Sequence, residues 1–170
     1  MNKYKLIIFD LDGTLTSLRL SPVHDAPFML LPNVAKKLAE LAAEQITLAI
    51  ATNQAAGTFR NRPYTQLIVE ERLNDLMKYF PMIPRDLMRV GRPGTDHWKP
   101  RPALLLDLLR DTRNEAENAL FVGDSGTDQK AAQNAGVHFA WAWDFFHWPE
   151  GSKNTTIDWG KRGQDIWRKP

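Results

Sequence analysis

Short, nearly continuous apolar runs alternate along this chain with longer stretches of helical periodicity. A continuous apolar run is typical of a strand covered on both faces, because a strand with one wet face alternates apolar and polar residues. The runs predict strands at residues 4–9, 46–51, 87–90, 119–122 and 137–141, and the periodic stretches predict helices at 33–44, 64–79, 101–113 and 128–134. This alternation predicts an α/β fold: a Rossmann-like three-layer sandwich with a central parallel sheet.

The domain organisation follows from the length of 170 residues, which suits one hydrophobic core. We predict a domain over residues 1–145 and a C-terminal tail, 146–170, that packs on it or extends it. The tail is rich in tryptophan and basic residues, and the sequence does not state its role. No segment reaches the roughly 20 apolar residues of a membrane span, and no apolar leader precedes the first strand. The absence of cysteine excludes disulfides and fits a cytoplasmic location.

Polar residues follow the predicted strands at the points where the apolar runs end. In parallel α/β sheets, ligands bind outside the carboxyl ends of the strands, so these residues are expected to converge on one edge. They are Asp10 and Asp12 after the first strand, Thr52 and Asn53 after the second, Lys99 beyond the third, and Asp124 and Asp128 after the fourth. The sequence therefore predicts a strongly acidic site at the carboxyl edge of the sheet.

The charge of this cluster implies a cation. Four aspartates and one lysine sum to −3 when all are ionised, and a pair of like charges 4 Å apart costs about 4 kcal/mol at an effective dielectric constant near 20. A divalent cation is the simplest compensation. Ligands that are all oxygen favour Mg²⁺, which keeps several waters and recruits phosphate groups.

The spacing of Asp10 and Asp12 indicates two different catalytic roles. In an extended chain, residues i and i+2 project to the same side, so both carboxyl groups are expected to face one reacting centre. One can attack while the other shuttles a proton, provided that their environments push their pKa values apart. The Thr52 hydroxyl and the Lys99 ammonium are suited to the oxygens of a phosphoryl group.

These residues resemble the motifs of the haloacid dehalogenase superfamily, of the phosphatase type. The resemblance covers roughly residues 4–141 and is carried by Asp10-Leu11-Asp12-Gly13-Thr14, Thr52-Asn53, Lys99-Pro100 and the segment from Gly123-Asp124 to Asp128. It implies hydrolysis of phosphomonoesters through a phosphoaspartyl intermediate. Asp10 would attack phosphorus, and Asp12 would protonate the leaving group and then activate water.

The resemblance also implies the ligands of the site. Substrate phosphate would be bound by Thr52, Asn53 and Lys99. Mg²⁺ would be bound by Asp10, the backbone carbonyl of Asp12 and Asp124, with Asp128 near or in that shell.

The Thr-Asn-Gln and Lys-Pro segments resemble the capless branch, subclass III, that contains histidinol-phosphate and heptose-bisphosphate phosphatases. The cysteine-rich zinc loop common in that branch is absent from residues 91–98. The family inserts a cap in one of two intervals. The first, residues 17–33, is shorter than the roughly 40 residues that a folding domain needs, and the second, residues 54–98, is filled by one predicted helix and one predicted strand. We therefore expect an open site without a cap domain, with Arg60, Arg62 and His24 as candidate substrate contacts on nearby loops.

The substrate expected from this branch is a small phosphorylated metabolite such as a sugar phosphate. One alternative is a 3′-phosphatase that acts on nucleic-acid ends, for which the aromatic and basic tail could bind a single strand. Another is a catalytically inactive phosphate-binding or receiver-like signalling domain, although a receiver would carry adjacent acidic residues after its first strand. We expect no membrane partner, and a homo-oligomer could cover the open site.

Overall fold

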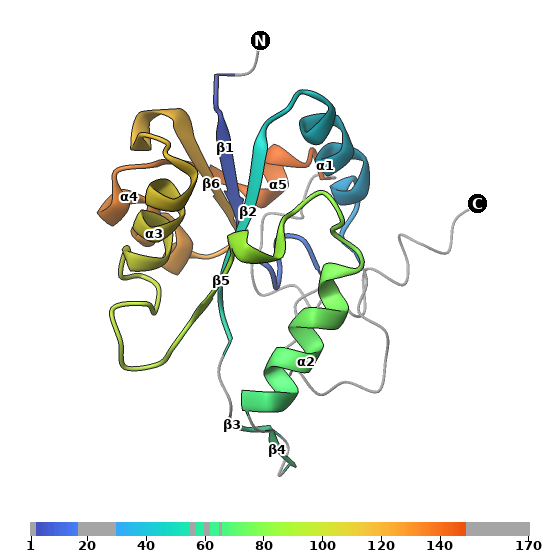
Figure 1. Cartoon of the computed structure of the whole chain (residues 1–170), viewed down its shortest axis with the longest axis vertical. Helices are drawn as coiled ribbons and strands as arrows, with labels where there is room; N and C mark the ends of the chain where they lie inside the picture. The colour runs from blue at the N-terminus through green and yellow to red at the C-terminus, as the bar shows by residue number, and fades with distance from the viewer. Residues whose placement is uncertain (1–2, 17–29, 55–56, 60–61, 65, 149–170) are drawn as a thin grey trace, which may run out of the picture.

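The computed structural model describes residues 3–16, 30–54, 57–59, 62–64 and 66–148 (Figure 1). Its centre is a five-stranded parallel sheet with strand order β5-β2-β1-β6-β7. The strands are β1 (Leu6–Phe9), β2 (Thr47–Asn53), β5 (Met88–Gly91), β6 (Ala119–Gly123) and β7 (His138–Trp141). The prediction of a Rossmann-like α/β fold with a central parallel sheet is confirmed.

Helices cover both faces of the sheet. They are α1 (Val34–Ala43), α2 (Gln66–Met77), α3 (Ala103–Thr112), α4 (Gly126–Ala135) and the short α5 (Ala142–Phe145). Single 3-10 turns at Arg85–Leu87 and Ala116–Asn118 precede β5 and β6. Among the described residues, no helix has the length and apolar character needed to cross a bilayer.

Two apolar cores lie on opposite faces because β1 alternates its side chains between them. Ile7 and Phe9 pack with buried residues of α1, α2 and α5, whereas Leu6 and Ile8 pack with buried residues of α3 and α4. All four β1 side chains are at most 1% exposed. This explains why the central strand is continuously apolar: both of its faces are covered.

The register of the sheet brings three strand ends to one edge. Phe9, the last residue of β1, pairs with Ile50 of β2 and with Val122 of β6. The residues that follow β1 and β6 therefore leave the sheet side by side, and β2 runs on to Asn53 at the same edge.

Between β2 and α2 the structure contains an antiparallel hairpin that the sequence analysis did not predict. Its strands are β3 (Gly57–Phe59) and β4 (Arg62–Tyr64). Each has only three residues, too few to show a period in the sequence. Figure 1 shows the hairpin and α2 beyond the carboxyl end of β2. Helix α5 was also missed, because it is a single turn of four residues.

The described start of the predicted tail belongs to the core. Trp148 is 8% exposed, and its indole N–H donates a hydrogen bond of 2.7 Å to the carbonyl of Pro32. Its ring stacks on Phe146, with the ring centres 5.6 Å apart. Trp148 is thus a packing anchor of the core, while Trp159 and Trp167 lie outside the described residues.

Candidate functional site

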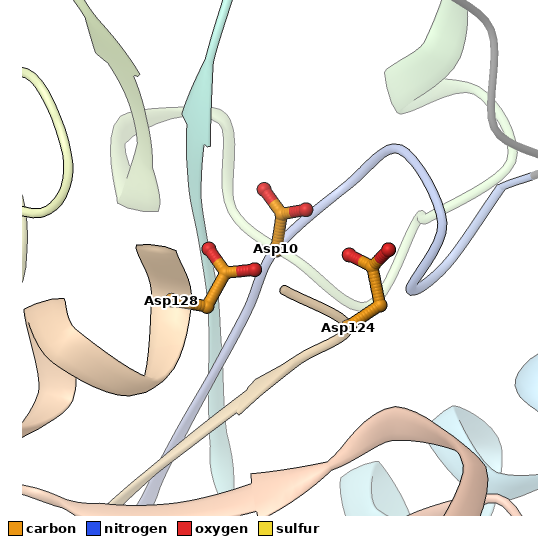
Figure 2. A group of neighbouring side chains, drawn as sticks. All are labelled: Asp10, Asp124 and Asp128. Carbon is orange, nitrogen blue, oxygen red and sulfur yellow. The ribbon is translucent and has the colours of Figure 1, made fainter. Parts of the chain in front are cut away.

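Three carboxyl groups meet at the carboxyl edge of the sheet. Asp10 follows β1, Asp124 follows β6, and Asp128 lies in the first turn of α4. Figure 2 shows their side chains turned to the same side, and one oxygen from each lies within 4.8 Å of the others. None of the three residues is more than 8% exposed. The predicted convergence of these strand ends therefore occurs.

Lys99 is buried against two of these carboxylates. Its Nζ lies 2.6 Å from Oδ1 of Asp10 and 2.7 Å from Oδ1 of Asp128, and it donates a third bond of 2.9 Å to the carbonyl of Ala51. Lys99 is 3% exposed. The three donors of the ammonium group are thus matched by three acceptors from β1, β2 and α4.

The backbone of Lys99 is held by Asn53, at the end of β2. The Asn53 side chain accepts a bond of 3.0 Å from the Lys99 N–H and donates one of 3.1 Å to the Lys99 carbonyl. The carbonyl oxygen and the –NH₂ group of the Asn53 side chain therefore both hold the backbone at Lys99. Asn53 was predicted as a substrate-binding residue, and in this structure its side chain bonds the backbone of Lys99.

Asp128 links the lysine to the start of α4. Its Oδ2 accepts bonds from the Ser125 N–H (3.1 Å) and the Ser125 hydroxyl (2.5 Å), while its Oδ1 accepts from Lys99. Ser125 is the N-cap of α4 and in return accepts a bond from the Asp128 N–H, which makes a capping box. Gly123 permits this packing, because a Cβ there would lie 2.5 Å from the Cβ of Asp128.

Asp124 is covered by the loop that follows β1. Oδ1 of Asp124 accepts a bond of 3.3 Å from the Thr14 hydroxyl. Gly13 lies over the carboxyl group, with a φ of 88° and a hypothetical Cβ only 2.7 Å from the Asp124 Cγ. Glycine fits here because it has no Cβ and adopts positive φ without strain.

Asp12 does not join the group of three. Strand β1 ends at Phe9, and the chain then turns, with the Gly13 N–H donating to the carbonyl of Thr16 at 2.8 Å. The carboxylate of Asp12 accepts a bond of 2.6 Å from the Gln54 amide and one of 3.2 Å from the Thr16 hydroxyl. The expectation that both carboxyl groups face one side assumed that the chain stays extended through Asp12, whereas it turns after Phe9.

Burial, together with the neighbouring negative charges, raises the pKa values of Asp10 and Asp124. Burial raises the pKa of Asp10 to about 8; Lys99 opposes this shift, while Asp128 and Asp124 add to it. Burial and the neighbouring Asp128 likewise raise the pKa of Asp124 to about 7. Burial alone would lower the pKa of Lys99, but the charges of Asp10 and Asp128 more than offset it, so the net shift is upward. Lys99 remains charged and does not neutralise the three carboxyl groups.

The donor set of this site fits a hard divalent cation. Three carboxylates against one ammonium leave a net charge of −2 when all are ionised. Because both oxygens of Asp128 are bonded to Lys99 and Ser125, Asp10 and Asp124 are the carboxylates best placed to hold an ion. Oxygen ligands of this kind favour Mg²⁺ or Ca²⁺ over softer metals.

Of the remaining predicted site residues, Thr52 is 2% exposed and lies at the carboxyl end of β2, directly after Ala51. His24 and Arg60 lie outside the described residues. Arg62 belongs to β4, where the structure does not describe the side chain.

Sequence reasoning assigned no role to Thr14, Thr16 or Gln54. All three stand within or next to the quoted motifs, and that proximity is the one signal by which they could have been found.

The family of the chain follows from its sequence relatives. The model of the family described as haloacid dehalogenase-like hydrolase matches residues 21–142, a stretch that includes Lys99, Asp124 and Asp128 and starts after Asp10 and Asp12. The chain belongs to the haloacid dehalogenase-like hydrolase family.

Curated relatives of this chain include phosphoglycolate phosphatases. One, from Salmonella typhimurium, is 32% identical over 108 residues, which make up 64% of this chain and 37% of the relative. Another, from Rhodospirillum rubrum, is 33% identical over 135 residues, or 75% of this chain and 50% of the relative. The chain thus spans half or less of the length of these relatives.

Solved structures share the fold of this chain over most of its length. The magnesium and phosphate complex of D,D-heptose 1.7-bisphosphate phosphatase from B. bronchiseptica is 23% identical, with a TM-score of 0.62, and covers 97% of this chain and 99% of that chain. CbbY from Rhodobacter sphaeroides, solved with phosphate, is 18% identical, with a TM-score of 0.59 and coverage of 92% and 91%. At these identities the likeness concerns the fold.

Proposed function

We propose that this chain is a Mg²⁺-dependent phosphomonoester hydrolase that works through a phosphoaspartyl intermediate. The observation that carries the proposal is the buried group of Asp10, Asp124 and Asp128 against Lys99 at the carboxyl edge of the sheet. Membership of a hydrolase family and the phosphatases among its relatives support it. When bound between Asp10 and Asp124, Mg²⁺ would neutralise the surplus charge and draw a phosphate dianion to the site.

In the first step, a carboxylate oxygen of Asp10 attacks phosphorus while the bond from phosphorus to the leaving oxygen breaks. Asp12 gives its proton to that oxygen, so the leaving group departs as a neutral alcohol. In this proposal the ammonium group of Lys99, which bonds Asp10 and Asp128, stabilises the charge of the phosphoryl oxygens.

In the second step, Asp12 takes a proton from a water molecule as that water attacks the phosphorus of the phosphoaspartate. The bond between Asp10 and phosphorus breaks, inorganic phosphate leaves, and the Asp10 carboxylate returns. Asp12 is again protonated and ready for the next ester, so protons balance over the cycle.

The proposed substrate class is a small phosphorylated metabolite, such as a sugar phosphate or a phosphorylated hydroxy acid. The names of relatives support it: phosphoglycolate phosphatases by sequence and a heptose-bisphosphate phosphatase by fold. The alternative of a nucleic-acid 3′-phosphatase depended on the aromatic and basic tail, and residues 149–170 of that tail lie outside the described residues.

The proposal is tested by assaying the purified chain with p-nitrophenyl phosphate and Mg²⁺, alongside Asp10→Asn. We expect the wild type to release nitrophenol, and the variant to lose this activity while keeping the wild-type circular dichroism spectrum. EDTA should stop turnover, and added Mg²⁺ should restore it. Full activity of Asp10→Asn would exclude the assigned nucleophile, and an inactive wild type that still binds Mg²⁺ would indicate a binding protein. A panel of sugar phosphates, 2-phosphoglycolate and 3′-phosphorylated oligonucleotides would then identify the substrate class.

A further inference from the structure

The carboxylate of Asp12 is bonded from two sides. The Gln54 amide donates to Oδ2 at 2.6 Å, and the Thr16 hydroxyl donates to Oδ1 at 3.2 Å. Gln54 is 7% exposed and follows β2, whereas Thr16 is fully buried in the turn after β1. A neighbouring strand therefore contributes to the placement of a side chain that belongs to the β1 turn.

We propose that Gln54 is a positioning residue for Asp12: its amide fixes the carboxyl group for proton exchange with the leaving oxygen. This inference rests on the proposed phosphatase function, in which Asp12 protonates the leaving group. Gln54 itself touches neither the substrate nor the reacting atoms in this scheme; it acts through Asp12.

The hydrogen-bonding capacities of the two partners support this role. The –NH₂ group of an amide can only donate, so Oδ2 of Asp12 stays an acceptor for as long as Gln54 is bonded to it. A threonine hydroxyl can donate or accept, so Thr16 is compatible with Oδ1 both with and without a proton. In the proposed scheme, Oδ2 is therefore the oxygen through which Gln54 anchors the Asp12 side chain.

Charge and geometry also favour an anchor at this point. Asp12 follows two positions after Asp10, which belongs to a buried group of three carboxylates whose charge exceeds that of Lys99. Without the hydrogen bond from Gln54, the Asp12 side chain could adopt several rotamers. A hydrogen bond from the buried Gln54 amide favours one of these rotamers. Misplacement of a catalytic group by about 1 Å can lower the rate about 10²-fold.

The test compares two substrates of similar shape whose leaving groups differ in their need for a proton. This comparison separates the positioning of Asp12 from a general structural effect. Phenyl phosphate needs its leaving oxygen protonated, whereas p-nitrophenolate is a good leaving group without that help. We expect Gln54→Leu to lower kcat/KM for phenyl phosphate about 10- to 100-fold and kcat/KM for p-nitrophenyl phosphate less than about threefold. The ratio kcat/KM is used because it reports the steps up to phosphoryl transfer and not the later hydrolysis.

A second variant and a double-mutant cycle complete the test. Gln54→Glu keeps the size of the side chain but removes the donor, so its loss should match or exceed that of Gln54→Leu. In an Asp12→Asn background, Gln54→Leu should cost less than about twofold for phenyl phosphate, because residues that act as a unit are not additive. Gln133→Glu makes the same chemical change on the exposed face of α4 and should leave both rates unchanged.

Each outcome bears on the inference. Equal losses on the two substrates, or a full additional loss in the Asp12→Asn background, would overturn it, because Gln54 would then act independently of Asp12. Unchanged rates in both Gln54 variants would also overturn it. A wild type that hydrolyses neither substrate would instead contradict the proposed function.

Discussion

Removal of the Lys99 ammonium group, as in Lys99→Met, is the perturbation whose effect the structure defines best. The variant leaves Asp10, Asp124 and Asp128 buried without a cation. At the observed separations of 2.6 and 2.7 Å, each ion pair is worth a gross attraction of about 6 kcal/mol at an effective dielectric constant of 20. The desolvation of the charges offsets much of this, and removal of one partner from a buried pair costs about 3–5 kcal/mol of unfolding free energy.

The loss of unfolding free energy in Lys99→Met should depend on pH, and the pKa values determine the direction of this dependence. The folded-state pKa of Asp10 is already raised from 3.8 to about 8, and it rises further when Lys99 is removed. Between these values the folded protein binds more protons than the unfolded chain, so stability falls as pH rises, by up to about 1.4 kcal/mol per pH unit for one proton. In the wild type this loss of stability ends where the folded carboxyl groups ionise, near pH 7 for Asp124 and pH 8 for Asp10, whereas in Lys99→Met it continues to higher pH. We therefore expect the cost of Lys99→Met to be larger near pH 8 than near pH 5.

Urea unfolding followed by circular dichroism, at both pH values and with and without Mg²⁺, measures this effect. The control is Lys78→Met, because the Lys78 Nζ lies the same 2.6 Å from an Asp75 oxygen but both side chains are at least 70% exposed. The control should show no resolvable change, and Mg²⁺ should restore part of the stability of Lys99→Met. If Lys99→Met loses less than about 1 kcal/mol near pH 8, or loses the same amount at both pH values, the argument from buried charge is refuted.

The other predictions concern the affinity for Mg²⁺ and the N-cap of α4. Because the pKa values of Asp10 and Asp124 are raised to about 8 and 7, Mg²⁺ must displace protons below these values. Its affinity should therefore weaken steadily as pH falls from 8 to 6, with proton release seen by calorimetry in two buffers; a pH-independent affinity would contradict the raised pKa values. Ser125→Ala removes the N-cap and one donor to Asp128, and should cost about 1 kcal/mol in urea unfolding. If Ser125→Ala unfolds like the wild type, the capping box does not hold α4 in place.

The sheet and the meeting of the acidic residues were determined by the sequence alone. Continuous apolar runs identify strands covered on both faces, and the ligand-binding ends of parallel strands share one edge, so the sequence alone brings Asp10, Asp124 and Lys99 together. The hairpin β3–β4 and the single-turn α5 could not be predicted, because elements of three or four residues carry no measurable period.

The partner of each polar side chain was decided by the tertiary structure. Asp12 bonds Gln54 across 42 positions of the chain, Asn53 bonds Lys99 across 46, and Thr14 bonds Asp124 across 110. Such contacts depend on where the chain turns after each strand, and the turn after β1 is itself shaped by the side chain of Asp124, over which Gly13 fits because it has no Cβ. Apolar periodicity is a local property that the sequence displays directly, whereas hydrogen-bond partners are selected by the packing of distant segments, which exists only in the folded protein.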